Sequence, residues 1–473
     1  MDHALDCVLR PSHPAVLADL PFLSLAELAR RLGTGATTSV AITQACLANI
    51  DEQDANLHAF VEVWRDDALR LARAADLERE AGFVRGRLHG IPIALKDLFH
   101  VAGRQTTAGS RSRLGRISTG TAQCVQRLLD AGMVPLGKTH MVELAYGTWG
   151  TNVPLGAPWN PWDLCVHRVA GGSSSGSAVA VAAGMAPAAL GTDTGGSVRI
   201  PASLCGLVGL KPTYGRIPLE GVVPLSRSLD SVGPLARSVE DAMLLVAVMA
   251  GEPEPAPLPA TSLAGLRITA LAGSQFPDFI EPGVVAAFAA SVARLRELGA
   301  LVTQEAIPFD FAELGTKNGR LIGIEGYAAH RELVDDDRAD MDPGVRMRMR
   351  LGSTASAAEY LDALEARASA MASFTLWMQG RDALVTPMLP ITARPVNAVD
   401  EATYPLATWS RAVNYLGACA LSVPASLSSD GLPIGIQFVG CGGAESALCR
   451  LAIAAMPGEG HWLLGAARRP PGP

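Results

Sequence analysis

The stretch from Gly171 to Ser197, GGSSSGSAVAVAAGMAPAALGTDTGGS, holds two clusters of glycine and hydroxyl residues joined by an uncharged run of alanine and valine. The first cluster is Gly171–Ser177 and the second is Gly191–Ser197. The apolar run between them predicts a buried segment. Glycine lets a backbone approach other groups closely, and a serine hydroxyl can act as a nucleophile. The stretch therefore predicts a site that combines backbone N–H donors with serine hydroxyls.

The composition is that of a compact protein with a large core. The chain has 473 residues, of which 49% are hydrophobic and 18% charged, and its net charge is −7. This acidic balance argues against a nucleic-acid-binding face, which needs clustered basic residues. The apolar segment Ala178–Leu190 is too short to span a membrane, and the N-terminus lacks the pattern of a secretory signal. We therefore expect a cytoplasmic protein with no membrane partner.

Strand-like and helix-like segments alternate along the chain. The apolar segment Ile91–Leu95 predicts a strand, Thr121–Ala131 a helix and Met133–Leu136 a further strand. Segment 251–259, GEPEPAPLP, predicts a loop, and Ala312–Gln379 is predicted to be mostly helical. The alternation favours an α/β fold with a largely buried mixed sheet.

Two short motifs suggest other functions, and each lacks the context that its function needs. Gly132–Thr139 fits the phosphate-loop pattern G-x-x-x-x-G-K-[ST], but its middle is apolar and includes Pro135, which has no N–H. Gly172–Gly176 fits the nucleophile-elbow pattern around Ser174, which requires a later histidine. The later histidines are His330, predicted to be a solvated surface residue of a charged helix, and His461 near the C-terminus.

The cysteines and histidines do not predict a metal site. The eight cysteines form no C-x-x-C pair, and the nine histidines are scattered without metal-ligand spacing. We expect reduced thiols, mostly in the core.

A serine site without a histidine needs another base, and Lys96 is the candidate. It ends the apolar segment Ile91–Lys96, and deep burial would lower its pKa by several units. From the local sequence alone, a strand-end lysine that extends its ammonium group into solvent remains the simpler interpretation.

Five segments of the chain resemble the amidase signature family of serine hydrolases. They are His89–Asp97, Gly132–Gly147, Ala170–Pro218, Ser228–Ala242 and Gly431–Gly440. The resemblance extends from about Ser24 to the end of the chain. It implies one amidase signature domain over residues 1–473, with a central mixed β-sheet surrounded by α-helices. Within it, the core motifs span 89–242 and a variable substrate-binding helical region spans about 312–380.

The resemblance also implies a Ser–cis-Ser–Lys triad. In this chain Lys96 would be the base, Ser173, after a cis peptide, the bridging serine, and Ser197 the nucleophile. The expected oxyanion-hole donors are the backbone N–H groups of Thr194, Gly195, Gly196 and Ser197.

Supporting roles follow from the same resemblance. Ser174 and Thr192 would hydrogen-bond the proton relay, and an ion pair of Asp193 with Arg199 would hold the oxyanion loop, with a plain salt bridge as the alternative. The substrate pocket is predicted at Tyr146, Gly147, Thr148 and Trp149. The alternative that the resemblance leaves open is a small polar pocket of the malonamide or biuret type. A set of large apolar residues suggests instead a roomy pocket for aryl or alkyl groups, unless they belong to the core: Trp149, Met341, Met347, Met349, Trp377, Met378 and Trp409.

The implied activity is hydrolysis of a carbon–nitrogen bond, other than a peptide bond, in a small amide or carbamate (urethane), with esterase activity as a side reaction. No cofactor and no metal is implied, and a monomer or homodimer is expected. The alternative is a partner-dependent catalytic subunit of the amidotransferase or carboxybiuret-hydrolase type. The family branch that amidates tRNA usually has glutamine where this chain has Ile200, which favours a free-standing hydrolase.

Overall fold

The computed structural model describes residues 19–256 and 262–455. Three features of the sequence lie outside these ranges: Cys7, His461 and the last residues, 257–259, of the proline-rich segment. Within the described ranges, no helix has the length and hydropathy needed to cross a membrane.

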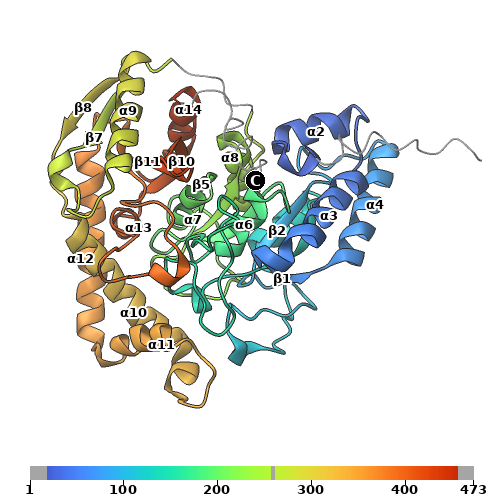
Figure 1. Ribbon diagram of the computed structural model, residues 1–473, viewed down its shortest axis with the longest axis horizontal. Helices are drawn as coiled ribbons and strands as arrows, with labels where there is room; N and C mark the ends of the chain where they lie inside the picture. Colours follow the sequence, from blue (N-terminus) through green and yellow to red (C-terminus); the bar gives the residue numbers. More distant parts are fainter. Residues whose placement is uncertain (1–18, 257–261, 456–473) are drawn as a thin grey trace, which may run out of the picture.

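An 11-stranded mixed sheet forms the centre of the molecule (Figure 1). Strand β2 pairs in parallel with β3 and β4, and β7 pairs in parallel with β8 and β9, whereas the remaining pairs are antiparallel. The α/β prediction with a mixed sheet is therefore confirmed. In spatial order the strands are β1 (Phe60–Val63), β3 (Val134–Thr139), β2 (Pro92–Lys96), β4 (Ala189–Thr192), β6 (Val232–Ala236), β5 (Val208–Lys211), β10 (Cys419–Leu427), β11 (Pro433–Gly440), β9 (Ala383–Pro387), β7 (Arg267–Leu271) and β8 (Leu301–Glu305).

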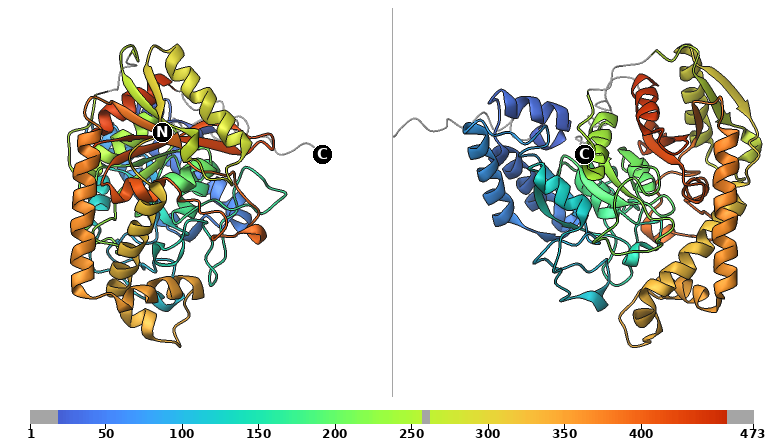
Figure 2. Two further views of the ribbon diagram at one scale, coloured as in Figure 1. Left: turned by 90° about the vertical axis from the view of Figure 1, so that its left-hand side faces the viewer. Right: turned by 180° about the vertical axis from the view of Figure 1, so that it is seen from behind.

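Helices surround the sheet. Figures 1 and 2 show α2–α4 at one end of the molecule and α9–α12 at the other. The α-helices are α2 (Leu25–Gly33), α3 (Ser39–Leu57), α4 (Arg65–Glu80), α5 (Gln123–Asp130), α6 (Ser175–Ala182), α7 (Arg199–Leu204), α8 (Val239–Ala250), α9 (Pro282–Glu297), α10 (Phe311–Asp335), α11 (Pro343–Arg350), α12 (Ala357–Trp377), α13 (Ser410–Tyr415) and α14 (Glu445–Ala455). Short 3₁₀ helices occur at η1 (Leu20–Phe22), η2 (Arg111–Arg113), η3 (Glu143–Ala145), η4 (Gly273–Gln275), η5 (Leu351–Thr354) and η6 (Val396–Ala398).

The stretch 171–197 forms the centre of this architecture. Its alanine-rich run makes the fully buried helix α6 and then strand β4. Gly176 lets the start of α6 approach the neighbouring backbone, because a Cβ there would lie 2.3 Å from the carbonyl oxygen of Ala59. Strand β4 runs parallel to β2 with Leu190 beside Leu95. This register brings both hydroxyl clusters to the end of β2, where Lys96 lies.

The described cysteines are unpaired, and most are buried, as expected for core thiols. Cys165 is exposed and Cys441 is half-buried. The predicted helical region is also confirmed, since Ala312–Gln379 contains α10, α11 and α12.

Candidate active site

Lys96 lies at the end of β2 with its side chain fully buried. Its Nζ lies 2.8 Å from Ser173 Oγ, 3.0 Å from Ser174 Oγ and 3.0 Å from Thr192 Oγ1. Among the described residues, no carboxylate forms an ion pair with it. Burial lowers its pKa from 10.5 to about 7, although the charges of Asp193 and Asp230 partly oppose this shift. The interpretation as a solvated strand-end lysine is therefore wrong.

The three hydroxyls around Lys96 match the hydrogen-bonding capacity of a neutral amine. A neutral lysine has two N–H donors and one lone pair, whereas an ammonium group has three donors and no acceptor. Lys96 can therefore donate to Ser174 and Thr192 while it accepts from Ser173. The low pKa favours a lysine that can accept a proton near neutral pH, and the three hydroxyl groups can accommodate that neutral amine.

The two hydroxyl clusters meet where Ser174 lies beside Ser197. The peptide bond between Gly172 and Ser173 is cis, as the resemblance implies. The backbone N–H of Ser174 donates to the carbonyl oxygen of Ser197 over 3.3 Å, which ties one cluster to the other. Ser197 keeps 5% of its surface exposed, and its hydroxyl makes no hydrogen bond within the described part of the chain. That hydroxyl is free to contact a bound molecule.

A buried ion pair holds the loop that carries Ser197. Arg199 Nε and Nη2 each donate to Asp193 over 2.9 Å, and both side chains are fully buried. Asp193 also accepts from the N–H groups of Gly196, at 2.7 Å, and Val198, at 3.2 Å. Burial alone would raise the pKa of Asp193, but the charge and hydrogen bonds of Arg199 outweigh it and hold the pKa well below its usual range.

Sequence reasoning missed three residues that complete this network. Asn414 donates to both the carbonyl oxygen and the carboxylate of Asp193, at 3.0 and 2.9 Å. Gln437 accepts from Arg199 at 2.5 Å, and Ser410 donates to the carbonyl oxygen of Gly195 at 2.7 Å. These residues lie more than 200 positions away in the chain and form no local motif, so pattern reading had no signal for them.

One of the four predicted oxyanion donors already has a hydrogen-bond acceptor in the structure. The N–H groups of Thr194, Gly195 and Ser197 have no hydrogen-bond acceptor within residues 19–256 and 262–455. The N–H of Gly196 donates instead to Asp193. The expectation that Gly196 offers a free donor is therefore wrong in this structure, since the carboxylate that shapes the loop already binds it.

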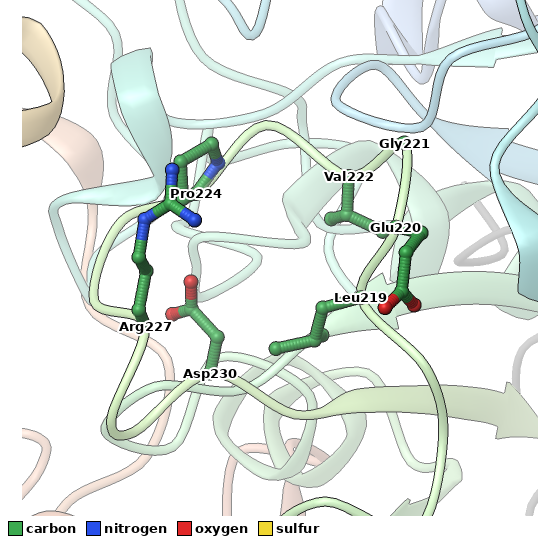
Figure 3. Close-up of a pocket in the computed structure, with 7 residues that line it drawn as sticks. All are labelled: Leu219, Glu220, Gly221, Val222, Pro224, Arg227 and Asp230. Carbon is green, nitrogen blue, oxygen red and sulfur yellow. The ribbon is translucent and has the colours of Figure 1, made fainter.

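Residues between Leu219 and Asp230 line a pocket of about 410 Å³ (Figure 3). Arg227 and Asp230 lie on one side of it, and Leu219 and Val222 lie on the other. Asp230 accepts from the hydroxyl of Thr194 at 2.6 Å. Burial raises the pKa of Asp230 to about 6, against the opposing effect of the Thr194 hydrogen bond. Asp230 thus connects this pocket to the Ser197 loop.

The predicted pocket segment divides between a cavity and the core. Tyr146 borders a cavity of about 480 Å³, next to Arg348. The carbonyl oxygen of Thr148 accepts from the N–H of Gly172 at 2.7 Å. Gly147 makes room for Val142, whose Cγ1 would lie 2.9 Å from an added Cβ. Trp149 is only 1% exposed and belongs to a hydrophobic cluster, so its predicted place in the pocket is wrong.

The large apolar residues do not build a roomy apolar pocket. Met347 is 62% exposed, and Trp377 packs against Phe309 and Phe374. The remaining members are core residues, as the alternative interpretation held: Trp149, Met341, Met349, Met378 and Trp409. None of them lines the cavity beside Tyr146, whose lining mixes glycine, threonine, charged and small to medium apolar residues.

The structure also accounts for the phosphate-loop pattern and for His330 of the nucleophile-elbow interpretation. The phosphate-loop pattern forms strand β3, in which Lys138 is buried and paired with Asp97 at 3.2 Å. His330 is buried rather than solvated, because its Nε2 bonds the carbonyl oxygen of Pro224 at 2.7 Å. Burial lowers the pKa of His330 to about 4. Among the described residues, no group of three or more His, Cys, Asp or Glu side chains could hold a metal ion.

Comparison with known proteins agrees with this geometry. Residues 41–449 match the family model described as Amidase. The chain is 37% identical over 477 residues to a glutamyl-tRNA(Gln) amidotransferase subunit of Chloroflexus aggregans, covering 93% of this chain and 96% of the relative. It is 38% identical over 463 residues to the 2-amino-5-chloromuconic acid deaminase of Comamonas testosteroni, covering 94% and 98%.

A solved structure is equally similar. "Crystal structure of amidase" superposes with a TM-score of 0.84 and 34% identity, covering 92% of this chain and 100% of that one. The family model spans most of the chain and the relatives match over nearly their whole length. The chain therefore belongs to the amidase signature family, whose enzymes act on carbon–nitrogen bonds.

Proposed function

We propose that this protein is a free-standing amidase that hydrolyses a carbon–nitrogen bond in a small molecule through an acyl-enzyme on Ser197. The observation that carries the proposal is Lys96, a buried lysine that forms no ion pair with any described residue and lies 2.8 Å from Ser173 Oγ. A lysine held neutral in this way is the base that a serine site without histidine requires.

The proton moves along the hydroxyl chain in the first step. Ser197 Oγ attacks the carbonyl carbon of the substrate while its proton passes to Ser173 Oγ, and the proton of Ser173 passes to Lys96 Nζ. The carbon–nitrogen bond then breaks as the relay returns a proton to the leaving nitrogen, because an unprotonated amide anion leaves poorly. Water repeats the attack on the acyl-enzyme with Lys96 again as base, which regenerates Ser197.

The surroundings favour the charges that appear during this cycle. The transient ammonium of Lys96 lies in the field of Asp193 and Asp230, which raises the pKa of that amine and so stabilises its charged form. The N–H groups of Thr194, Gly195 and Ser197, which have no acceptor in the described part of the chain, supply donors for a developing oxyanion. Asp193 and Arg199 hold this loop in place, as positioning residues.

The proposal covers several classes of substrate that share the same acyl-enzyme chemistry. Amides are the first substrates in this proposal, and aryl amides, carbamates and esters are further substrates of the same acyl-enzyme chemistry. The name of the Comamonas relative, a deaminase of an amino-substituted acid, supports loss of a small nitrogen-containing group.

A partner-dependent role is the second candidate, because the Chloroflexus relative is named as one subunit of an amidotransferase. Ile200 favours the free-standing enzyme. It is fully buried in a hydrophobic cluster, at the position where the tRNA-amidating branch usually has glutamine.

The test is a substrate panel with the purified chain alone. Short amides, anilides, nitrophenyl carbamates and nitrophenyl esters are assayed for turnover, with Ser197→Ala as the background. We expect turnover of at least one amide by a single species on size-exclusion chromatography and none by Ser197→Ala. Turnover that needs an added partner protein would support the second candidate, and amide turnover that survives in Ser197→Ala would refute both.

A further inference from the structure

Arg411, on α13, is a cation without a counter-ion beside the loop of Ser197. A Cβ on Gly195 would lie 3.1 Å from Arg411 Cγ and 3.7 Å from its Nε, so the arginine side chain lies directly against that loop. Its guanidinium makes no hydrogen bond and no ion pair with any described residue. An arginine head group has five N–H donors and is rarely left without an acceptor.

The neighbouring cations are already compensated. Arg348 lies 3.2 Å from Glu401, and Arg320 lies 3.0 Å from Glu359. Both of these arginines line the cavity of about 480 Å³ beside Tyr146. Arg411 lies at the same place, because its Nη1 would be 3.7 Å from a Cβ on the cavity-lining Gly319. Burial and the charge of Arg348 lower the pKa of Arg411, against the opposing effects of Tyr146 and Glu401.

Asn318 adds a second unpaired polar group at the same place. Its side chain is fully buried, and its Nδ2 donates to the carbonyl oxygen of Thr194 over 3.3 Å. Its Oδ1 has no hydrogen-bond partner among the described residues and would lie 3.4 Å from a Cβ on Gly195. An unsatisfied acceptor and a guanidinium that forms no ion pair with the described residues therefore lie against one residue of the loop.

We propose that Arg411 binds a carboxylate on the acyl part of the substrate, so that the enzyme prefers monoamides of short dicarboxylic acids. The planar guanidinium binds a carboxylate through two parallel N–H···O bonds, which fixes the orientation of the acyl chain. The inference rests on the proposed amidase function and names its substrate class.

The distance to the nucleophile limits the length of the acyl chain. Consecutive Cα atoms are about 3.8 Å apart, so the Cα atoms of Gly195 and Ser197 are separated by at most about 7.6 Å. A carboxylate bound to Arg411 and a carbonyl carbon at Ser197 can therefore belong to one small molecule. This places only a few carbon atoms between the carboxylate and the scissile amide.

Glutaramate (5-amino-5-oxopentanoate) and pentanamide form a matched substrate pair, since a methyl group replaces the carboxylate. We expect kcat/KM to be about 100-fold higher for glutaramate, the scale of a well-placed charge pair. Arg411→Met should remove most of this preference, and Arg411→Lys should keep part of it because the charge remains while the planar fork is lost. The control Lys317→Met removes an exposed cation of α10 that pairs with Glu313 and should leave the preference unchanged.

Calorimetry with Ser197→Ala separates this inference from the proposed function, because binding is then measured without turnover. Glutaramate should bind to Ser197→Ala, and the affinity should fall about 100-fold when Arg411→Met is added. Arg411-dependent binding without turnover by the wild-type chain would refute the amidase function and leave the carboxylate site standing. Turnover of both amides with equal kcat/KM, a preference that survives in Arg411→Met, or no binding of glutaramate would overturn the carboxylate site.

Discussion

The pH dependence of the reaction should report the titration of Lys96. Its pKa of about 7 replaces the ordinary value of 10.5 because the amine is fully buried. At pH 7 about half of the molecules then carry a neutral lysine, against roughly three in ten thousand for an ordinary lysine. Burial therefore raises the fraction of active base roughly a thousandfold at neutral pH.

The sign of the effect follows from the role of Lys96 as base. The neutral form is active, so kcat/KM for a neutral amide should fall about tenfold per pH unit below pH 7 and reach a plateau above about pH 8. The rate of inactivation by a fluorophosphonate, measured over the same pH range, should follow the same curve. A rate that still rises tenfold per unit between pH 8 and 10 would refute the lowered pKa, and a rate that stays constant down to pH 5 would refute Lys96 as the base.

Asp230→Asn provides the control, because Asp230 has a pKa of about 6 and could cause a similar acid limb. Its negative charge raises the pKa of Lys96. Removal of that charge should therefore move the acid limb to lower pH while the limb itself persists. Disappearance of the limb in Asp230→Asn would assign it to the carboxyl group and contradict our assignment.

Three further predictions concern the surroundings of the site. Asp193→Asn should lower the free energy of unfolding by about 3–5 kcal/mol in urea titrations, because it leaves the guanidinium of Arg199 buried without its anion; a change below about 1 kcal/mol would contradict this. His330→Ala should cost about 1–3 kcal/mol of stability through its lost hydrogen bond but leave kcat/KM unchanged, whereas an inactive folded variant would restore the nucleophile-elbow interpretation. Gly176→Ala should destabilise the protein by about 1–3 kcal/mol or more, since its Cβ would lie 2.3 Å from a carbonyl oxygen, while the control Gly33→Ala, with nothing within 4 Å of the added Cβ, should be neutral or stabilising.

Local patterns predicted the parts of the fold that local physics determines. Ser24 is an example of such a local feature, because its hydroxyl caps α2 and accepts from the N–H of Glu27 at 3.2 Å. Strand β2 and helix α5 were predicted because the apolar residues of each segment follow a single pattern. Strand β5 (Val208–Lys211) and strand β10 (Cys419–Leu427) were not identified, because their pairing joins segments about 200 residues apart.

The candidate active site was also predictable from the sequence only in part. The resemblance named Lys96, but its low pKa depends on burial, and local sequence favoured a solvated lysine. His330 was misplaced because the charged residues around it on α10 conceal the buried face of that helix. No sequence pattern indicated Arg411, because its proposed role depends on the lack of an ion pair with the described residues. Only the folded structure shows whether a side chain has an ion-pair partner.

The central claim is that Ser197 is the nucleophile and that Lys96 activates it. Peptide mapping by mass spectrometry after reaction with a fluorophosphonate tests both parts together. We expect a single adduct on Ser197, no adduct in Ser197→Ala, and labelling of Lys96→Ala slowed by roughly a thousandfold or more. An adduct on Ser174, or labelling of Lys96→Ala at the wild-type rate, would contradict the account.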